Sequence, residues 1–258
     1  MLSVHRATTR LRIQEHCSRL CQTGRLGKRQ DSRDRIERRI VELGRRHLAT
    51  EGAAGLSLRA IARDLDMVSS AVYRYVASRD DLLTLLLVDA YTELADTVES
   101  ARDGTSDPWQ AQLASMARAA RLWAVQQPAC WALLYGSPVP GYHAPRDQTV
   151  GPGTRVVGAL FSVVATNVSA GDVTQSEIVA YQPLSKDFDG LRAEFDFDAG
   201  DTAIAKCLVL WAALVGAISL EVFGQYGTDT FTDPAATFET QVALLTDMLD
   251  RPRTDPEN

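Results

Sequence analysis

Apolar residues recur at helical spacing through most of this chain, beginning with a stripe over residues 31–51. Ile36, Ile40, Leu43 and Leu48 lie three to five positions apart, so a helix would place all four on one side. Arginines fill many of the intervening positions and give that helix a basic, solvated surface. The pattern therefore predicts a first amphipathic helix with its apolar side turned toward a core.

Two shorter apolar stripes follow, and they predict two short helices separated by a tight turn. The first covers residues 58–65, with Ser57 before it as a cap whose hydroxyl accepts a backbone N–H bond. The second runs from about residue 69 to 76, with Ser69 taking the cap position. Between them, Asp66 tolerates the left-handed backbone of a sharp reversal, and the next residue is an apolar methionine. This arrangement is a helix-turn-helix.

A long helix is predicted over residues 79–102. Ser78 and Asp81 form a capping box at its start, with Asp81 as a shorter stand-in for the usual Glu. Apolar positions continue to its end at Asp103-Gly104. At 1.5 Å per residue this helix spans more than about 30 Å, so it can carry a displacement from a distant site to the helix-turn-helix.

The rest of the chain is interpreted as further helices joined by loops. Asp107-Pro108 and Asp233-Pro234 each place an N-cap Asp before a Pro at the first helical position. Residues 154–168 are rich in β-branched side chains, so a strand is the alternative there. A helix is favoured because no partner strand with matching alternation is visible elsewhere. The predicted helices cover residues 108–127, 129–135, 154–168, 201–226 and 234–249, with loops over 136–153 and 170–200.

These elements predict an all-α protein with an N-terminal three-helix helix-turn-helix domain and a larger C-terminal helical domain. With 258 residues, 45% of them hydrophobic, the chain can bury a sizeable core and is long enough for two modest domains. The expected divisions are a basic flexible extension over residues 1–30, the helix-turn-helix domain over 31–78, the C-terminal domain over 79–250 and a tail over 251–258.

Charge is distributed unevenly between the two parts. The whole chain carries −6, which by itself argues against binding to nucleic acid. Residues 1–80 nevertheless hold 17 Lys and Arg against 9 Asp and Glu, and the remainder holds 10 against 24. Because local basic groups supply most non-specific affinity for phosphate, the N-terminal part is suited to DNA despite the sign of the whole chain.

The second short helix presents an outward set of side chains that fits the major groove. Ser69 and Ser70 are small enough to let the helix approach, while Arg74 and the two flanking tyrosines reach bases and phosphates. An ordinary helical hairpin with a solvated basic face is the alternative, and spacing alone favours DNA binding only modestly over it.

Several separate pieces of residues 35–83 resemble the DNA-binding domain of the tetracycline-repressor (TetR) family in order and spacing. They are the first apolar stripe, Glu51-Gly52 at its end, LSLRAIA over residues 56–62, and YRYV with SRDDLL over residues 73–83. The sequence departs from the family at two positions. Asp66 stands where the family usually has a glycine in the turn, and Val68 stands where it usually has a serine that caps the recognition helix. The resemblance implies a dimeric regulator that binds a near-palindromic DNA operator.

The resemblance also implies roles for matching positions. Phosphate contacts fall to Ser57, Tyr73, Tyr75 and Arg79, base contacts to Ser69, Ser70 and Arg74, and either role to Arg59. Partial packing against the domain core is an equally open reading of Tyr73. The WAALVGAISLE segment is similar to the Trp-His-Gly signature of one C-terminal domain type in the family, although Val215 stands where the histidine would be.

A small-molecule effector pocket and a dimer face are expected in the C-terminal part. Apolar and aromatic side chains on three of its helices suit a drug-sized hydrophobic compound. The candidate wall residues are Tyr91, Met116, Trp123, Trp131 and Phe161. The candidate interface residues are Trp211, Gly216, Ala217 and Leu220, whose small members permit close helix approach.

Catalytic and metal-binding signatures are absent from the sequence. It has no Gly-rich phosphate loop, nucleophile elbow or metalloprotease helix, so an enzyme is not expected and no cofactor is implied. Cys17 and Cys21 near His16 lack the second ligand pair of a structural zinc site, so no metal is expected. No apolar run long enough for a membrane span is expected, and a cytoplasmic protein follows.

The leading prediction is therefore a sequence-specific transcriptional regulator, in particular a repressor released from its operator by a small molecule. Two alternatives stay open. One is a constitutive or architectural DNA-binding protein without ligand control, and the other is a helical module whose helix-turn-helix segment contacts protein. Steep salt dependence of DNA affinity would separate DNA binding from the protein-binding alternative.

Overall fold

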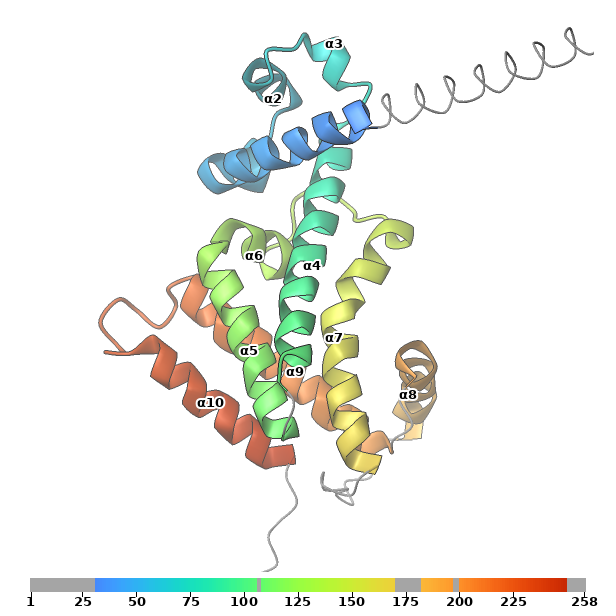
Figure 1. Ribbon diagram of the computed structural model, residues 1–258, viewed down its shortest axis with the longest axis vertical. Helices are drawn as coiled ribbons and strands as arrows, with labels where there is room; N and C mark the ends of the chain where they lie inside the picture. The colour runs from blue at the N-terminus through green and yellow to red at the C-terminus, as the bar shows by residue number, and fades with distance from the viewer. Residues whose placement is uncertain (1–30, 106–107, 170–181, 197–199, 250–258) are drawn as a thin grey trace, which may run out of the picture.

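The computed structural model describes residues 31–105, 108–169, 182–196 and 200–249, and every regular element in these ranges is helical (Figure 1). This confirms the all-α prediction. The predicted basic extension over residues 1–30 and the tail over 251–258 lie outside the described residues. A small helical unit stands at one end of α4 (Arg79–Asp103), and the remaining helices surround the rest of α4.

The helix-turn-helix is built as its apolar spacing indicates. A helix over residues 31–55 lies beneath α2 (Leu58–Asp64) and α3 (Ser69–Val72). Its Ile40 and Leu43 are fully buried, and Ile61 of α2 joins them in the same core. A polar contact adds to this packing, because His47 Nε2 and Asp64 Oδ2 are 2.7 Å apart. The helix over residues 31–55 and α2 are therefore held together by apolar packing and by this polar contact.

The start of α4 confirms the capping prediction. Ser78 has extended backbone, and its Oγ accepts the Asp81 N–H at 3.0 Å. Asp80 and Asp81 lie in the first turn, where negative charge is favoured by the helix dipole. Leu82 and Leu83 are fully buried against the helix-turn-helix, while Leu94 and Val98 are buried in the body. One continuous helix therefore contributes to the packing of both parts.

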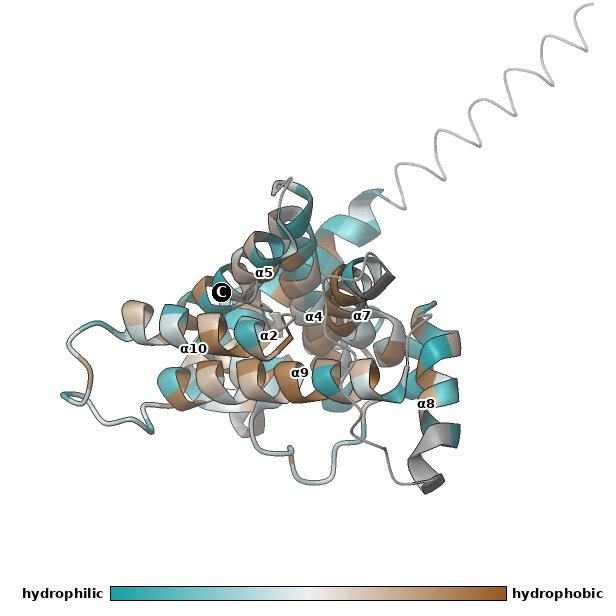
Figure 2. Ribbon diagram, turned by 90° about the horizontal axis from the view of Figure 1, so that it is seen from below, coloured by the Kyte–Doolittle hydropathy of each residue, from teal (hydrophilic) through white to brown (hydrophobic). Residues whose placement is uncertain are grey.

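The body consists of helices packed around α4. In Figure 1, α5 (Trp109–Gln126) and α6 (Pro128–Tyr135) lie on one side of α4, α7 (Arg146–Ser169) lies on the other, and α9 (Asp201–Val222) crosses behind. Next to α9 and α5 lies α10 (Pro234–Leu249), and Figure 2 shows α9 and α10 side by side. The predicted cap of α10 is confirmed, since Asp233 Oδ1 accepts the Ala236 N–H at 3.0 Å. The cap of α5 is different: Pro108 itself is the N-cap residue.

Residues 146–153 were expected to be loop, but they form the first turns of α7. The N–H groups of Gln148 and Thr149 donate to the Pro145 carbonyl, which starts the helix just after that proline. Pro152 lies inside the helix and removes one N–H donor. Packing overrides this local cost because Gly153 faces α4, where a Cβ would lie only 3.4 Å from the Tyr91 ring. The helical prediction for residues 154–168, against a strand, is confirmed.

Residues 182–195 were also expected to be mostly loop, but they form α8 (Gln182–Phe195). The acidic composition of this segment concealed a sparse apolar stripe. Phe188 is buried, and Leu191 and Phe195 pack against the core at helical spacing. The Phe195 ring stacks on Phe161 of α7 with centroids 5.0 Å apart. Docking on α7 therefore supplies the apolar contact that makes this polar helix stable.

Arginine–glutamate pairs connect the outer helices. Arg121 of α5 donates two hydrogen bonds to the Glu221 carboxylate of α9, at 2.7 and 2.5 Å. Arg118 of α5 binds Glu239 of α10 in the same two-pronged manner, at 2.6 and 2.8 Å. Such paired geometry fixes orientation more firmly than a single contact. These pairs fix α9 and α10 in position against α5.

The composition of α9 corrects one expectation. This helix is long and apolar enough to cross a membrane by length and composition, with a mean hydropathy of 2.1 in its most apolar window, although no such run was expected. Only 39% of that window is buried within the chain. Ile204, Leu210 and Ile218 are buried in the core, whereas Leu208 and Val209 are exposed. One apolar face of α9 therefore packs in the core, and a second apolar face is exposed.

Candidate functional site

The turn of the helix-turn-helix has the predicted backbone. Asp66 has φ 54°, the left-handed conformation that allows the chain to reverse between α2 and α3. The Met67 N–H donates to the Ala62 carbonyl at 2.9 Å, which closes the end of α2. Ser57 is the N-cap residue of α2, but its side chain makes no capping hydrogen bond, so that part of the prediction is wrong.

The recognition segment is shorter as an α-helix than expected. Its N-cap is Val68 rather than Ser69, and α3 extends only from Ser69 to Val72 before the chain continues as turns over residues 73–75. Val72 and Val76 are fully buried, so the segment is anchored to the core at its middle and just after its end. The intervening residues keep a helical course because the Tyr75 N–H donates to the Val72 carbonyl at 2.8 Å. The segment therefore presents one outward surface from residue 69 to 75.

The candidate DNA-contacting side chains differ in their exposure. Arg59, Ser70, Tyr73 and Arg74 are exposed, with Tyr73 at 45%, whereas Ser57, Ser69, Tyr75 and Arg79 are half-buried. The exposed members and Ser69 belong to α2 and the recognition segment. These two neighbouring segments therefore carry hydroxyl, guanidinium and phenol groups that are accessible to a partner.

Tyr75 and Arg79 also have partners within the protein. Arg33, from the first described helix, places its guanidinium carbon 5.6 Å from the centre of the Tyr75 ring. The Arg79 Nη2 donates to the Ala53 carbonyl at 2.7 Å, near the end of that same helix. Arg33 was not singled out from the sequence, because a contact between residues 33 and 75 has no local signal. The first contact positions the recognition segment relative to the first helix, and the second positions the start of α4 relative to it.

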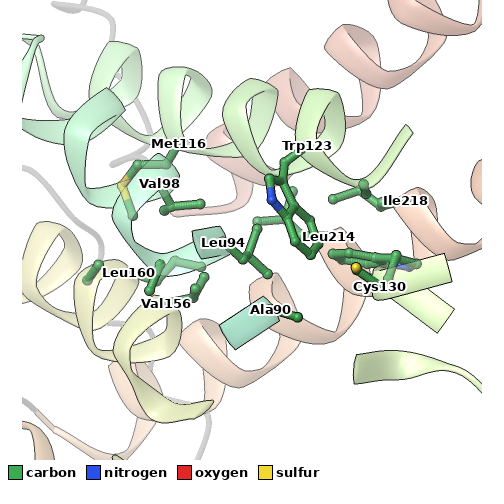
Figure 3. Close-up of a cluster of buried hydrophobic side chains, with 14 of the residues drawn as sticks. Ala90, Leu94, Val98, Met116, Trp123, Cys130, Val156, Leu160, Leu214 and Ile218 are labelled. Atoms are coloured by element: carbon green, nitrogen blue, oxygen red, sulfur yellow. The ribbon is translucent and has the colours of Figure 1, made fainter. Parts of the chain in front are cut away.

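A second candidate site is an apolar cavity in the body. It lies between α4, α5, α6, α7 and α9, and all of its wall residues are apolar or tryptophan. The free space at its centre is small: the volume that the centre of a water molecule could occupy is ≈ 20 Å³. Figure 3 shows part of the surrounding cluster. The wall residues are Leu94, Val98, Leu113, Met116, Ala117, Ala120, Trp131, Val156, Leu160, Trp211, Leu214, Val215 and Ile218.

The five candidate pocket residues are distributed around this cavity rather than all on its wall. Met116 and Trp131 line it, and Trp123 is buried in the adjoining cluster. Tyr91 lies farther toward the helix-turn-helix and meets the Tyr135 ring edge-on, with centroids 6.4 Å apart. Phe161 stacks on Phe195 on the α8 side. Tyr135, which the sequence analysis did not select, contacts both tryptophans of the wall.

The candidate interface residues on α9 fall on different sides of that helix. Trp211 lines the cavity, and Ala217 packs partly against the core. Leu220 is 36% exposed, and a Cβ added at Gly216 would meet no atom within 4 Å. Other exposed apolar residues lie along α9 and α10. These are Leu208, Val209, Phe223, Leu244 and Met248, and together with Gly216 and Leu220 we call them the outer apolar face.

Among the described residues, no group of three His, Cys, Asp or Glu side chains is arranged to hold a metal ion. The Cys17, Cys21 and His16 cluster lies outside them. Neither the helix-turn-helix surface nor the cavity presents paired carboxylates or an activated nucleophile. The two sites can bind partners, and the arrangement defines a helix-turn-helix protein with a separate helical body.

Comparison with known proteins narrows this class. Residues 113–245 match the family model described as the tetracyclin repressor-like C-terminal domain. The HTH-type transcriptional regulator Rv1816 of Mycobacterium tuberculosis is 62% identical over 231 residues, covering 89% of this chain and 99% of that protein. This chain belongs to the TetR family of helix-turn-helix transcriptional regulators. Its relatives are named as regulators rather than enzymes, as expected.

Solved structures agree with this assignment. A regulatory protein designated SCO4313 is 32% identical, with a TM-score of 0.70 over 84% of this chain and 98% of that one. FadR from Bacillus subtilis, solved in complex with stearoyl-CoA, has a TM-score of 0.58 over 82% of this chain and 98% of that one. At 11% identity the FadR likeness concerns the fold alone. Members of the TetR family are soluble proteins that bind DNA operators and small-molecule effectors and act as dimers.

Proposed function

We propose that this regulator is a cytoplasmic repressor that binds a near-palindromic operator as a homodimer and releases it when a small-molecule effector enters the body. The observation that carries this proposal is the position of α4. Leu82 and Leu86, in its first turns, lie against Gly44 of the first described helix, and its later residues Leu94 and Val98 line the cavity. A ligand that displaces the lower part of α4 would therefore also move the DNA-binding surface.

Contacts between the first described helix and α4 support this coupling. Arg45 donates to Asp89 at 2.6 Å and to Glu93 at 2.5 Å, both on α4. One turn earlier, a Cβ at Gly44 would lie only 3.0 Å from the Leu86 side chain, so the two helices are in close contact. The helix-turn-helix is thus fastened to α4 along about its first four turns and would follow its displacement as a rigid body.

Sharp release requires two DNA-binding units at a fixed separation. Two recognition segments enter successive major grooves only when they lie about 34 Å apart, so a small change in tilt lowers affinity strongly. The outer apolar face of α9 and α10 supports pairing of two subunits there, because exposed apolar residues at these positions would be covered in a dimer. Two α9–α10 pairs would form a four-helix contact around Gly216 and Leu220.

For the DNA-binding surface, we propose phosphate contacts by Ser57, Tyr73, Tyr75 and Arg79, base contacts by Ser69, Ser70 and Arg74, and either role for Arg59. The exposure of Arg74 and Ser70 supports base reading, since both are free to enter a groove. Arg79 has N–H groups besides the one that donates from Nη2 to Ala53, and a phosphate would compete for them with Asp80, whose Oδ1 lies 3.8 Å from Arg79 Nη1.

The experiment uses the purified full chain and a labelled DNA fragment from upstream of its own coding sequence. Fluorescence anisotropy would measure the dissociation constant over a range of salt concentrations, with a scrambled fragment of the same length as control. A repressor should prefer its upstream fragment and lose affinity steeply with salt. Thermal-shift screening of metabolites and antibiotics would then identify compounds that bind, and anisotropy of the protein–DNA complex would show which of them release the DNA. Equal affinity for both fragments would contradict specific recognition, and a failure of every stabilising compound to release DNA would favour a constitutive DNA-binding protein.

A further inference from the structure

Two buried hydrogen-bond donors in the body lack a hydrogen-bond partner among the described residues. They are Nε1 of Trp123, a residue only 5% exposed, and the hydroxyl oxygen of Tyr135. A buried N–H or O–H that stays unpaired carries the full cost of leaving water, so folded proteins contain few of them. By contrast, the neighbouring Trp131 donates its Nε1–H to Ser219 at 3.1 Å. The two unpaired groups therefore require an explanation.

Both side chains belong to the cluster that surrounds the apolar cavity, one layer behind its wall. The Tyr135 ring lies 4.4 Å from Trp131 and 5.8 Å from Trp211, centroid to centroid, and both tryptophans are wall residues. Figure 3 shows Trp123 between Leu94 and Ile218, two further wall residues, with its indole nitrogen turned toward the side of Leu94. A molecule that occupied and widened the cavity would thus lie beside a hydroxyl and an N–H that the protein leaves unused.

The surroundings limit what such a molecule can be. No charged side chain lines the cavity, so a charged group placed there would lose its hydration without gaining an opposite charge. Burial raises the pKa of Tyr135, with a smaller contribution from Tyr91, which keeps its hydroxyl protonated and able to donate. The indole N–H of Trp123 can only donate. The Tyr135 hydroxyl can also accept, so an acceptor on the ligand is the one kind of group that would satisfy both.

We propose that Tyr135 and Trp123 determine effector specificity, and that the effector is an uncharged, largely apolar molecule whose carbonyl or ether oxygens accept hydrogen bonds from them. This inference rests on the proposed function, since it names the ligand class of the same cavity. It assigns the two unpaired donors a purpose: they cost stability in the free protein and are satisfied only in the ligand-bound form.

The test compares three probes of nearly the same shape: acetylnaphthalene, ethylnaphthalene and naphthoate, substituted at the same ring position. Binding to the full chain is measured by calorimetry. One hydrogen bond to a buried donor predicts that the ketone binds about five- to tenfold more tightly than the hydrocarbon. The carboxylate should bind more weakly than either. This preference for the ketone should fall to less than about twofold in Tyr135→Phe or in Trp123→Phe.

Tyr142→Phe is the matched control, because the Tyr142 hydroxyl already lies 2.9 Å from Thr84 Oγ1 and has a partner. It should leave the ketone preference unchanged and lower the thermal unfolding midpoint. Tyr135→Phe should raise that midpoint without ligand, because it removes an unpaired buried hydroxyl.

The proposal is overturned if ketone and hydrocarbon bind equally, if naphthoate binds most tightly, or if both Tyr135→Phe and Trp123→Phe keep the ketone preference. Failure of all three probes to bind would also overturn it. In that case, retained affinity for the upstream DNA fragment would show that the proposed regulatory function still stands. Loss of that DNA affinity in the unmodified chain would instead reject the proposed function itself.

Discussion

Arg74 combines two properties of a base-reading residue: its side chain is exposed, and its backbone is held between the fully buried Val72 and Val76. If the guanidinium binds a guanine through two hydrogen bonds, Arg74→Ala should weaken the operator by about 1–3 kcal/mol and random DNA by less. Anisotropy titration of both DNA fragments would measure this difference. The buried flanking valines remain in place, so the fold should be unaffected.

Arg118→Ala is a suitable control for the removal of one positive charge. Arg118 is ion-paired with Glu239 on the body, away from the helix-turn-helix. Because both side chains of this ion pair are exposed, its loss should cost little stability. Arg118→Ala should therefore leave the affinities for the operator fragment and for random DNA unchanged. If Arg74→Ala weakened operator and random DNA by the same factor, Arg74 would be a phosphate-contacting residue instead.

Cys130 and Cys207 should be unreactive in the folded protein. Burial raises the pKa of both thiols, to about 12 for Cys207 from an ordinary value of 9.0. The folded protein holds the thiol proton more tightly than the unfolded chain does. The free energy of unfolding is therefore at its full value below pH 9, and it falls as the pH rises from 9 toward 12. In a Cys17→Ser, Cys21→Ser background, a thiol reagent at pH 8 should label neither cysteine until denaturant is added. Rapid labelling of the native protein would contradict this.

At the scale of the helices, the cap of α4 can be tested against that of α2. Ser78 Oγ accepts the Asp81 N–H, whereas Ser57 occupies the equivalent cap position of α2 without a side-chain bond. Ser78→Ala should therefore lower the free energy of unfolding by about 1 kcal/mol. Ser57→Ala should change it by only a few tenths. Urea denaturation would measure both, and equal losses would show that the two serines contribute alike.

Sequence patterns predict the bounds of some helices and not of others. The bounds of α4 were predictable because a capping box, a continuous apolar stripe and a terminal glycine all agree. The first turns of α7 were not, since Pro152 and its glycine neighbours indicate loop, and only contact with Tyr91 of α4 favours a helix there. In α8, few apolar residues mark the face that docks on Phe161. Local signals suffice where they agree, and tertiary packing decides where they conflict.

The candidate sites follow a similar rule. The candidate DNA-contacting residues all lie within residues 57–79, so spacing and family resemblance along that stretch could propose them. The cavity is assembled from five helices, and spacing alone places Trp211 equally well on a wall or at an interface. Tyr135 escaped selection because its distinguishing property, an unpaired buried hydroxyl, exists only in three dimensions.

For the whole molecule, Gly216→Leu tests where two subunits meet. A side chain at Gly216 meets no atom within 4 Å in the single chain, so the monomer should tolerate leucine. Leucine also has a higher helix propensity than glycine, which is roughly 0.8–1.0 kcal/mol less favourable than alanine in a helix interior. In a close α9–α9 contact the same side chain would overpack the interface and yield monomers. Light scattering coupled to size exclusion would measure the mass.

Gly190→Leu makes the same substitution at an exposed position of α8 where a side chain also meets nothing within 4 Å. This variant should keep the mass of the unmodified protein. A dimer that persisted in Gly216→Leu would show that the subunits pair through another surface.

The cavity has almost no free space when it is empty, and this affects the ligand concentration that a response through this cavity would need. Any ligand larger than about one water must separate the helices before it can bind, so part of its affinity is used for opening. The packing density of the body therefore sets the concentration at which the regulator responds. Trimming a wall residue, for example Leu113→Ala, would lower the stability of the empty form and shift the response to lower ligand concentrations. Sensitivity can thus be retuned by changes in packing alone, without any change in the groups that recognise the ligand.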